Sequence, residues 1–306
     1  MTKFTVEPQP KPASRPYVLM TAAYNEEAYI ERTIQSILTQ THLPRRWVIV
    51  SDGSVDGTDE IVRSFARKHE FISFLRNERS PGRSFGSKVA ALRHGSKLLE
   101  SVGFEFIGNV DADVSVGSSY FEDLIARFEL DPKLGLAAGF VCEKDRDNYE
   151  SRSINRVHSV AHAAQLVRRE CYEAIGGYAV LEYGGEDWCA QISARMRGWT
   201  AEAFPELQIL HHRPTGTADN LLRSKFREGR SDYSFGSDPL FEVLKCLRRL
   251  PERPFVIGGI ARFAGFTWSY LRRDKRPVGP EVVTFLRNEQ RQRLFSIFHR
   301  VGEHRK

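Results

Sequence analysis

The sequence predicts an α/β protein with a mostly parallel sheet that helices cover on both faces, followed by a basic, largely helical C-terminal region. Short apolar strands alternate with amphipathic helices from Tyr17 to about residue 130, the order typical of parallel sheets. The strands are continuously apolar, which indicates burial on both faces. Charge is distributed unevenly. Residues 1–220 carry 26 Lys and Arg against 30 Asp and Glu, whereas residues 221–306 carry 19 against 9.

Length and composition limit the class of protein. The 306 residues suffice for one large α/β domain with an appended segment. Hydrophobic residues make up 41% and charged residues 27%, which excludes a disordered chain, a collagen-like fibre and a disulfide scaffold. The four cysteines lack paired short spacing, so we expect no zinc knuckle and a reduced, cytoplasmic compartment. Residues 1–15 are polar and contain prolines; we expect a disordered leader there, without the apolar core of a signal peptide.

The first half of the chain supplies most of the predicted sheet. Asn25 is a candidate N-cap followed by Glu26 and Glu27 in a first helical turn. Ser119 and Glu122 have the spacing of a capping box. Apolar runs bounded by turn residues predict the strands. In chain order we expect strands at 17–21, 47–51, 72–76 and 105–110, and helices at 25–40, 58–70, 88–100 and from 119 onwards.

The pattern is looser after about residue 135. Stretches 167–175 and 188–197 have helical spacing and end at glycines, which commonly terminate helices. Short strands are expected at 136–142, 201–204 and 207–210, and helices beyond Leu221. We therefore divide the chain into a leader at 1–15, a sheet domain at 16–220 and a basic helical region at 221–306.

Polar residues gather where three predicted strands end. Tyr24 follows the first strand, Asp52 the second, and Asp111 and Asp113 the fourth. Ligands of open parallel sheets bind beyond the carboxyl ends of the strands. The sequence therefore predicts that these side chains share one site.

The residue types suggest a metal and a nucleotide, although each also has an ordinary structural interpretation. Asp111 and Asp113 would repel each other unless a cation such as Mg²⁺ or Mn²⁺ lay between them, but Asp-x-Asp is also common in turns. Asp52 either forms a turn with the next glycine or accepts a hydrogen bond from a base. Tyr24 is either a core residue or a surface on which a base stacks. Lys88 is either a solvated helix residue or a cation near a diphosphate.

Two further groups lie in the second half of the chain. Glu186 and Asp187 follow two glycines and open a helix. They either complement the helix dipole or supply a general base on a glycine loop. His211 and His212 follow the last predicted strand, where one of them could complete a metal shell or contact phosphate.

Taken in order, these motifs resemble those of the family 2 glycosyltransferases, which have the nucleotide-sugar-binding GT-A fold. The resemblance extends from about Tyr17 to Thr217, and the later stretch SDYSFGSDPLFEVLKCLRRLPERP is similar to the tails of bacterial exopolysaccharide-type members. The motifs that carry it are AAYNEE (22–27), SDGSVDGT (51–58), GSKVAALRHG (86–95), NVDADVSV (109–116), IGGY (175–178), GGEDW (184–188) and LQILHHR (207–213).

The resemblance implies roles for the donor-binding residues. Tyr24 would stack on the nucleobase, and Asp52 would bind its imide edge and favour uracil. Lys88 would lie near the ribose or diphosphate. Asp111 and Asp113 would form the DxD motif, with Asp113 the more direct metal ligand. The donor-binding set is then Ala22, Tyr24, Glu26, Asp52, Lys88, Asp111, Ala112 and Asp113, and the metal set is Asp111, Asp113, His211 and His212.

The acceptor side of the site has one unresolved assignment. Asp187 would be the base of an inverting transfer, but carboxylates occupy both 186 and 187, so Glu186 remains the alternative. A base there would take the proton of the acceptor hydroxyl, while a cation would neutralise the charge that develops on the leaving UDP.

The implied function is a Mn²⁺- or Mg²⁺-dependent, inverting glycosyltransferase of cell-surface polysaccharide assembly, acting at the cytoplasmic side. It would move a sugar from a nucleotide sugar, with a UDP-sugar favoured, to a saccharide or polyprenyl-linked saccharide. The absence of a Gln-x-x-Arg-Trp motif disfavours a processive synthase. A sugar nucleotidyltransferase would need a Gly-rich, lysine-containing loop where this chain has AAYNEE. A nucleic-acid-binding protein is motivated only by the pI of 9.2 and lacks a recognition motif, and a catalytically dead subunit would not need every motif carboxylate.

The tail contains one apolar helical stretch, Phe255–Leu271, which has 17 residues and one charge, Arg262. It is shorter than the ~20 residues of a membrane-spanning helix. Its small and polar residues form one stripe, its apolar residues face the other way, and basic residues flank it. The pattern suits either a helix lying in the interface of an anionic membrane or one packed on the catalytic domain. The stripe comprises Gly258, Arg262, Gly265 and Ser269, and the apolar face Val256, Ile260, Phe263, Thr267 and Tyr270.

Overall fold

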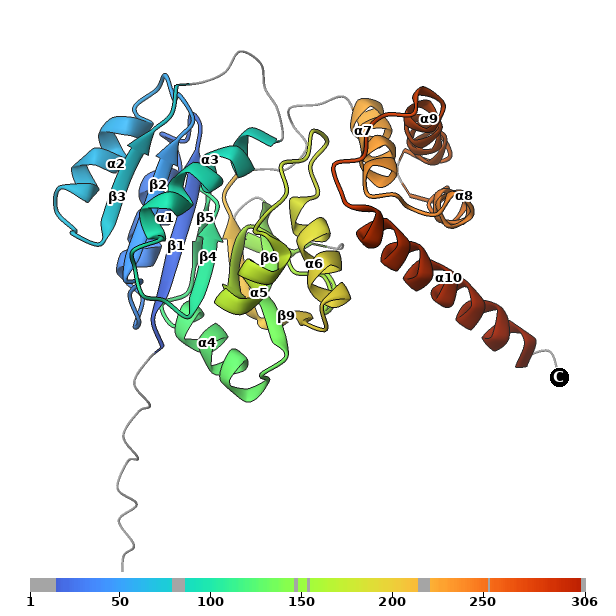
Figure 1. The fold of residues 1–306 in the computed structure, drawn as a ribbon. Coiled ribbons are helices and arrows are strands. Elements are labelled where there is room, and N and C mark those ends of the chain that lie inside the picture. The colour runs from blue at the N-terminus through green and yellow to red at the C-terminus, as the bar shows by residue number, and fades with distance from the viewer. Residues whose placement is uncertain are drawn as a thin grey trace, which may run out of the picture.

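The computed structural model describes residues 15–78, 86–145, 148–152, 155–213, 221–252 and 254–303. A central sheet with helices on both faces occupies one end of the molecule, and the last four helices form a group at the other end (Figure 1). The expected leader lies outside the described residues except for Arg15, whose side chain is 2.9 Å from Glu105. The expected domain boundary falls within 214–220, which are also outside them.

The sheet follows the strand order β3-β2-β1-β4-β8-β6-β9-β5, with β7 paired to β6. Neighbours among β3, β2, β1 and β4 are parallel. Strand β8 runs antiparallel to both β4 and β6, whereas β6 and β9 are parallel. The strands are β1 (Tyr17–Ala23), β2 (Arg46–Ser51), β3 (Ile72–Arg76), β4 (Phe106–Val110), β5 (Val114–Val116), β6 (Leu134–Asp145), β7 (Asn148–Ser151), β8 (Ala164–Arg168) and β9 (Thr200–His211).

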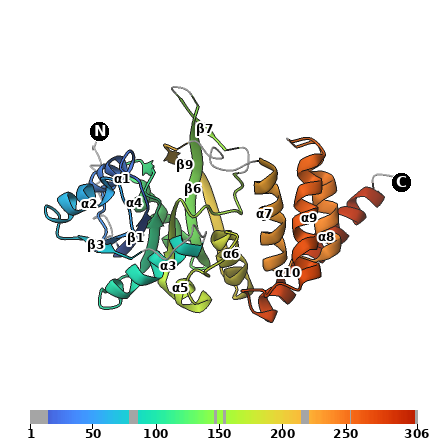
Figure 2. The same cartoon turned by 90° about the horizontal axis from the view of Figure 1, so that it is seen from above.

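Helices cover both faces of the sheet, as predicted. One face carries α1, α2 and α4, and the opposite face carries α3, α5 and α6 (Figure 2). The helices are α1 (Ile30–Leu38), α2 (Thr58–Ala66), α3 (Gly86–Ser96) with the short 3₁₀ turn η1 (Lys97–Leu99), α4 (Tyr120–Leu130), α5 (Arg169–Ile175), α6 (Glu186–Met196), α7 (Leu221–Ser234), α8 (Pro239–Arg248), α9 (Ile257–Arg272) and α10 (Pro280–Glu303).

One predicted helix start and one predicted capping box are wrong, for local reasons. Asn25 does not cap α1, because its backbone is left-handed with φ 55° and the helix begins five residues later. Asparagine tolerates this conformation better than most residues. Ser119 precedes α4, but its hydroxyl donates to Asp123, and Glu122 accepts from Thr41, so no capping box forms.

Two predictions in the second half are also corrected. Residues 167 and 168 belong to β8, so the helix expected at 167–175 starts at Arg169. The two strands expected at 201–204 and 207–210 form the single strand β9 with a bulge. Gly139 of β6 pairs with Phe204 and the next residue with Gln208, which leaves three residues of β9 unpaired on that side, as in a β-bulge.

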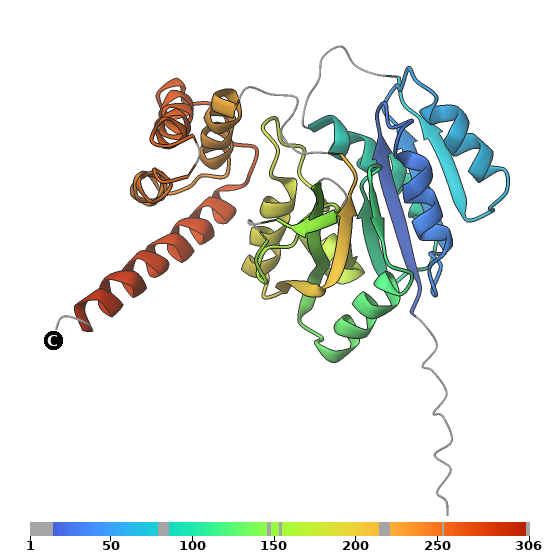
Figure 3. The ribbon, with the colours of Figure 1, turned by 180° about the vertical axis from the view of Figure 1, so that it is seen from behind.

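The C-terminal helices dock on α6 through a small apolar cluster. This second core unites the loop before α6, α6 itself, the end of α7 and α10; its buried members are Leu181, Cys189, Ile192, Phe235, Val282 and Leu286. Arg195 of α6 also donates two 2.9 Å hydrogen bonds to the carboxylate of Glu289 on α10. Figure 3 shows α10 extending from this contact past α7, α8 and α9 as one long helix.

Candidate functional site

The loops after β1 and β2 are tied together at the carboxyl end of the sheet. Asn25 donates its backbone N–H to Ser54 and accepts at its side chain from Val55. The backbone N–H of Glu26 donates to Thr58 at 2.8 Å. Ser54 and Thr58 of the SDGSVDGT motif therefore act as a clamp that holds the first loop in place. The motif alone did not reveal this role.

This clamp presents the predicted base-binding residues. Tyr24 is 37% exposed, so it is not an ordinary core residue. Asp52 is half-buried at the end of β2, where its backbone N–H donates to the carbonyl of Ala23. Ala22 is half-buried and is the second-last residue of strand β1. Tyr24 thus offers a stacking surface and Asp52 a hydrogen-bond acceptor on two neighbouring loops.

The DxD segment follows β4 on a fixed backbone. The backbone N–H of Asp111 donates to Ala163 at 2.7 Å, and the hydroxyl of Thr33 reaches the carbonyls of Ala112 and Val114. Ala112 is buried, so its side chain packs inward while the flanking carboxylates point out of the core. Nζ of Lys88 lies 2.6 Å from Oδ1 of Asp111. This lysine is therefore paired within the site and is not a solvated helix residue.

Asp113 is surrounded by cationic and polar partners. His211 lies 3.4 Å and Nε of Arg213 lies 3.3 Å from its carboxylate. Burial acts to raise the pKa of Asp113, but these two partners outweigh it and hold the pKa below its usual value. Arg213 also pairs with Glu26. Burial and the carboxylate of Asp113 nevertheless raise the pKa of Glu26 to about 7.

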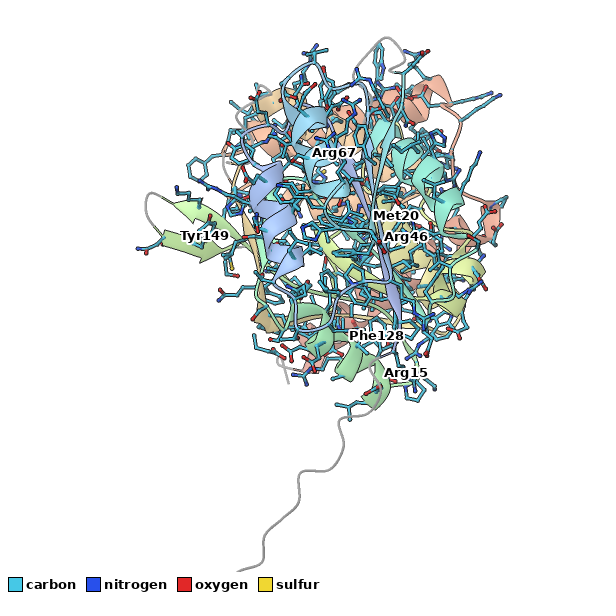
Figure 4. The ribbon with its side chains drawn as sticks, turned by 90° about the vertical axis from the view of Figure 1, so that its left-hand side faces the viewer. Arg15, Met20, Arg46, Arg67, Phe128 and Tyr149 are labelled. Carbon is cyan, nitrogen blue, oxygen red and sulfur yellow. The ribbon has the colours of Figure 1, made fainter. Side chains whose placement is uncertain are left out.

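The two adjacent histidines have different surroundings. His211 faces Asp113 through Nε2. His212 is hydrogen-bonded at both ring nitrogens, to the hydroxyl of Tyr149 at 2.6 Å and to that of Ser115 at 3.0 Å. Tyr149 lies on the hairpin of β6 and β7 that projects from the body of the molecule (Figure 4). His212 thus anchors this hairpin, and only His211 borders the DxD carboxylates.

Glu186 and Asp187 open α6 after a loop that requires glycine. Gly185 has φ 91°, and a Cβ there would lie 2.4 Å from the ring of Phe235. The loop is also held from the C-terminal helices, because the hydroxyl of Ser231 donates to the carbonyl of Gly184 at 3.1 Å. The basic tail therefore positions the loop that carries the predicted base.

The two carboxylates of this pair differ in environment. The side chain of Asp187 accepts a 2.7 Å hydrogen bond from the backbone N–H of Trp188. Burial and the neighbouring Glu186 raise the pKa of Asp187 to about 6. Glu186 lies 3.6 Å from Nδ1 of His162, a buried histidine whose pKa burial and the charge of Lys88 hold well below its usual value.

Sequence reasoning missed two residues of this site. Arg213 stands in the motif LQILHHR, and its position next to two histidines was the signal that could have marked it. His162 had no signal, because it lies in no motif and reaches Glu186 only through the fold. It packs edge-on against Tyr178 with ring centroids 4.2 Å apart.

A cavity of about 1010 Å³ opens beside Asp187. The loop before α6 forms one wall, and α7, α8 and α10 form the others. Its size falls at the upper end of ordinary small-ligand sites. Charged residues at its wall include Glu186, Asp187, Arg227, Arg248 and Arg293.

The carboxylate pair fits a hard divalent cation only in part. Within the described ranges, no group of three or more His, Cys, Asp or Glu is arranged to hold a metal by itself. Mg²⁺ is commonly bound by one or two protein carboxylates together with substrate phosphates. Asp111 and Asp113 with the carboxylate of Glu26 nearby provide such an oxygen-rich partial shell, which a diphosphate would complete.

Comparisons with known sequences show which protein family the sheet domain resembles. Residues 19–182 match the family model for glycosyl transferase family 2. The poly-beta-1,6-N-acetyl-D-glucosamine synthases of Staphylococcus epidermidis and of Staphylococcus aureus strain COL are 28% and 27% identical to this chain over 143 and 145 residues. Each match covers 47% of this chain and 32% of the relative. The chain thus spans about a third of the length of the curated relatives it matches.

Solved structures share the fold. The mannosyltransferase PcManGT from Pyrobaculum calidifontis, in complex with GDP-Man and Mn²⁺, has a TM-score of 0.53 at 17% identity and covers 92% of this chain and 81% of that one. Residues 1–349 of Staphylococcus aureus TarS, in complex with UDP-GlcNAc, have a TM-score of 0.53 at 15% identity, with coverage of 89% and 79%. The expected GT-A fold is confirmed.

Proposed function

The chain belongs to glycosyl transferase family 2. On this premise we propose that it is a glycosyltransferase that transfers one sugar at a time, with inversion, from a nucleotide sugar to a saccharide or lipid-linked saccharide. The acceptor would be an intermediate of cell-surface polysaccharide synthesis. The Staphylococcus relatives, which are named as polysaccharide synthases, support the link with polysaccharide synthesis. The proposal also fits the missing Gln-x-x-Arg-Trp motif, which disfavours processive elongation.

The observation that carries the proposal is the position of Lys88. It is 2.6 Å from Asp111, and its pKa responds to the charges of Glu186 and Asp187 as well. One lysine therefore lies close enough to Asp111 and to the carboxylates at the start of α6 for all of them to act on its charge. A glycosyl transfer needs both groups in one site, because the leaving diphosphate and the attacking hydroxyl lie on opposite sides of the anomeric carbon.

On the donor side, the exposed ring of Tyr24 would stack on the base and Asp52 would accept a hydrogen bond from the imide N–H of uracil. UDP-N-acetylglucosamine is the first donor to test, because the polysaccharide synthases that match this chain are named for N-acetylglucosamine. A GDP-sugar is the second, because the PcManGT structure contains GDP-Man.

A divalent cation, Mn²⁺ or Mg²⁺, would be held by Asp113 with Asp111, and when bound it would stabilise negative charge on the leaving diphosphate. His211 and Arg213 keep Asp113 ionised for this role, since both favour the charged carboxylate. Lys88 would add a second positive charge near the diphosphate. His212 is committed to Tyr149 and Ser115, so we place His211 alone at the edge of this shell.

We assign the general base to Asp187. A carboxylate with a pKa near 6 is a stronger base than an ordinary aspartate and is still ionised at neutral pH. The hydrogen bond from Trp188 fixes one oxygen, which leaves the other for the acceptor hydroxyl. Glu186 borders His162, and we give it a positioning role. The acceptor would then occupy the cavity between this loop and α7, α8 and α10.

The proposal is tested by screening UDP- and GDP-sugars for metal-dependent release of nucleoside diphosphate and for thermal stabilisation of the protein. We expect one donor to be hydrolysed slowly in Mn²⁺ or Mg²⁺ and to raise the melting temperature. A nucleotidyltransferase would instead make a sugar nucleotide from UTP and a sugar 1-phosphate, releasing diphosphate. That product, or undiminished turnover in excess chelator, would contradict the proposal.

A further inference from the structure

Helix α9 turns its small, polar stripe inward. Gly258, Arg262, Gly265 and Ser269 are all buried, whereas the amphipathic pattern of the sequence left open which side would face the protein. Helices α7 and α9 cross with their backbones in contact. A Cβ at Gly265 would lie 1.9 Å from the carbonyl oxygen of Phe226 on α7, so only glycine permits this approach.

A buried ionic network holds this crossing in place. The guanidinium of Arg262 donates to Asp232 of α7 at 2.8 Å and to Glu242 of α8 at 3.3 Å. Lys245 of α8 donates to the same aspartate at 2.7 Å. The single charge in the apolar stretch therefore belongs to the interior of the helical group. Removing one member would leave buried charges unpaired, so the orientation of α9 is fixed.

The opposite face of α9 is apolar and exposed. No charged residue lies on this face between Ile257 and Leu271. The loop that leads into it adds two more exposed apolar side chains. We call this surface the α9 apolar face; its members and exposed fractions are Phe255 60%, Val256 50%, Ile257 56%, Ile260 59%, Phe263 41%, Trp268 50% and Leu271 75%. Contiguous apolar surface of this kind normally marks a binding site.

Positive charge borders the C-terminal end of this face. Arg273 and Lys275, which follow α9, are exposed, and no carboxylate of the described residues pairs with them. Arg272 is 60% exposed and lies 3.5 Å from Asp274. Across residues 221–306 the net charge is +10. An apolar helix face bordered by cations is typical of a helix that lies in the interface of an anionic membrane.

We infer that the α9 apolar face docks this enzyme on the surface of an anionic lipid bilayer. Ile260, Phe263 and Trp268 would enter the acyl boundary, and the flanking arginines and Lys275 would contact lipid headgroups. Among the described helices none is long and apolar enough to cross a bilayer, so this contact is peripheral. Charge disfavours a second copy as the occupant, because self-association would bring the same cations face to face.

Vesicle co-sedimentation of the full chain tests the inference without donor or acceptor, so its result is independent of the proposed reaction. We expect binding to vesicles of phosphatidylcholine with phosphatidylglycerol, little binding to phosphatidylcholine alone, and weakening in 0.5 M salt. The emission of Trp268 should shift to shorter wavelength and be quenched by brominated lipid. The other tryptophans, Trp47, Trp188 and Trp199, are buried or half-buried.

Matched variants separate the apolar and the electrostatic contributions. Phe263→Ser with Trp268→Ser should lower the vesicle partition coefficient at least tenfold. Leu130→Ser, which changes an even more exposed apolar residue on α4, should leave it unchanged. Arg273→Gln with Lys275→Gln should lower binding and its salt dependence, whereas the same charge change at Arg67 and Lys68 on the far side of the sheet should not.

Three outcomes would overturn the inference. A chain that stays in the supernatant at low salt does not dock on lipid. Binding that is equal in the wild type and in the Phe263→Ser, Trp268→Ser variant places the contact elsewhere. A concentration-dependent dimer in sedimentation velocity, abolished by that double variant and accompanied by no vesicle binding, would assign the α9 apolar face to a second copy.

Discussion

Two aspartates of the candidate site lie in contrasting surroundings. Asp113 follows β4 and contacts His211 and Arg213, which keep its pKa below the usual value in spite of burial. Asp187 lies at the start of α6, where burial and the adjacent Glu186 raise its pKa to about 6. The same residue type is thus held ionised at one end of the site, whereas at the other end its raised pKa suits the proposed general base.

The difference comes from which part of the chain surrounds each residue. The partners of Asp113 are the last residue of β9 and the second residue beyond its end, so the sheet domain alone builds that side. The loop of Asp187 is supported by Ser231 and Phe235 at the end of α7. In the proposed reaction the sheet domain would therefore supply the donor side, while the C-terminal helices would help to shape the acceptor side. Carboxylates with divergent pKa values commonly mark separate chemical roles.

The largest effect is expected from a substitution that removes the proposed base. Asp187→Asn keeps the shape of the side chain and its hydrogen bond from Trp188 but abolishes its proton affinity. We expect kcat to fall by about 10²–10⁴, the usual contribution of a general base, with donor affinity nearly unchanged. The measurement is steady-state transfer together with donor binding by calorimetry. If Glu186→Gln shows the larger loss, the base is one residue earlier.

The donor side is tested by Asp113→Asn. This variant keeps the contacts of the side chain but removes the negative charge that would hold the cation. We expect turnover to fall by about 10²–10³, as when one electrostatic stabiliser is lost, and the half-saturating Mn²⁺ or Mg²⁺ concentration to rise. Metal titrations of donor binding measure this. His212→Gln is the matched control, and an equal metal defect in it would contradict the separate placement of the two histidines.

The sequence could predict only the part of this contrast that depends on residues close together in the chain. Asp111, Asp113 and Asp187 stand in short motifs at strand or helix ends, so the sequence could identify them. The partners that set their pKa values come from elsewhere in the chain. Arg213 reaches Glu26 across 187 positions, and no spacing within a motif predicts such a pair.

The helical region illustrates the same limit. Periodicity separated two faces of the stretch that forms α9 but did not show which one is inside. The answer depends on Asp232 and Glu242, which lie 30 and 20 positions away from Arg262. Similarly, Asn25 had the residue type of a helix cap, but Ser54 and Val55 recruit it to clamp two loops. Tertiary contacts overrode local propensity in both places.

The contrast also predicts a pH dependence. The proposed base is active only when ionised, so kcat should rise about tenfold per pH unit below pH 6, following the pKa of Asp187 at about 6. A further, smaller rise that continues to about pH 7 would belong to Glu26, whose pKa is raised to that value. Asp113 should contribute no step in this range, since its pKa is held below the usual value of an aspartate. Profiles of kcat between pH 4.5 and 8 measure this. In Asp187→Asn the residual kcat should no longer rise with pH below pH 6. If the rise persists, a group other than Asp187 causes it.

The smallest expected effect concerns stability and runs opposite to activity. Asp187 binds a proton in the folded state up to about pH 6, whereas an unfolded aspartate releases it near pH 3.9. The folded state thus holds more protons in this window, and the free energy of unfolding falls as pH rises from about 4 to 6 and stays lower above it. A pKa shift of about two units changes the free energy of unfolding by at most about 3 kcal/mol.

The side chain introduced in the variant Asp187→Asn does not titrate. At pH 8 the variant should therefore be more stable than the wild type by up to that amount, and at pH 4 the difference should shrink. Denaturant unfolding at both pH values measures it, with Glu150→Gln on the exposed hairpin as a control that should change little. A destabilised Asp187→Asn at pH 8 would show that the charge of Asp187 is compensated in the fold, which would contradict a pKa raised to about 6.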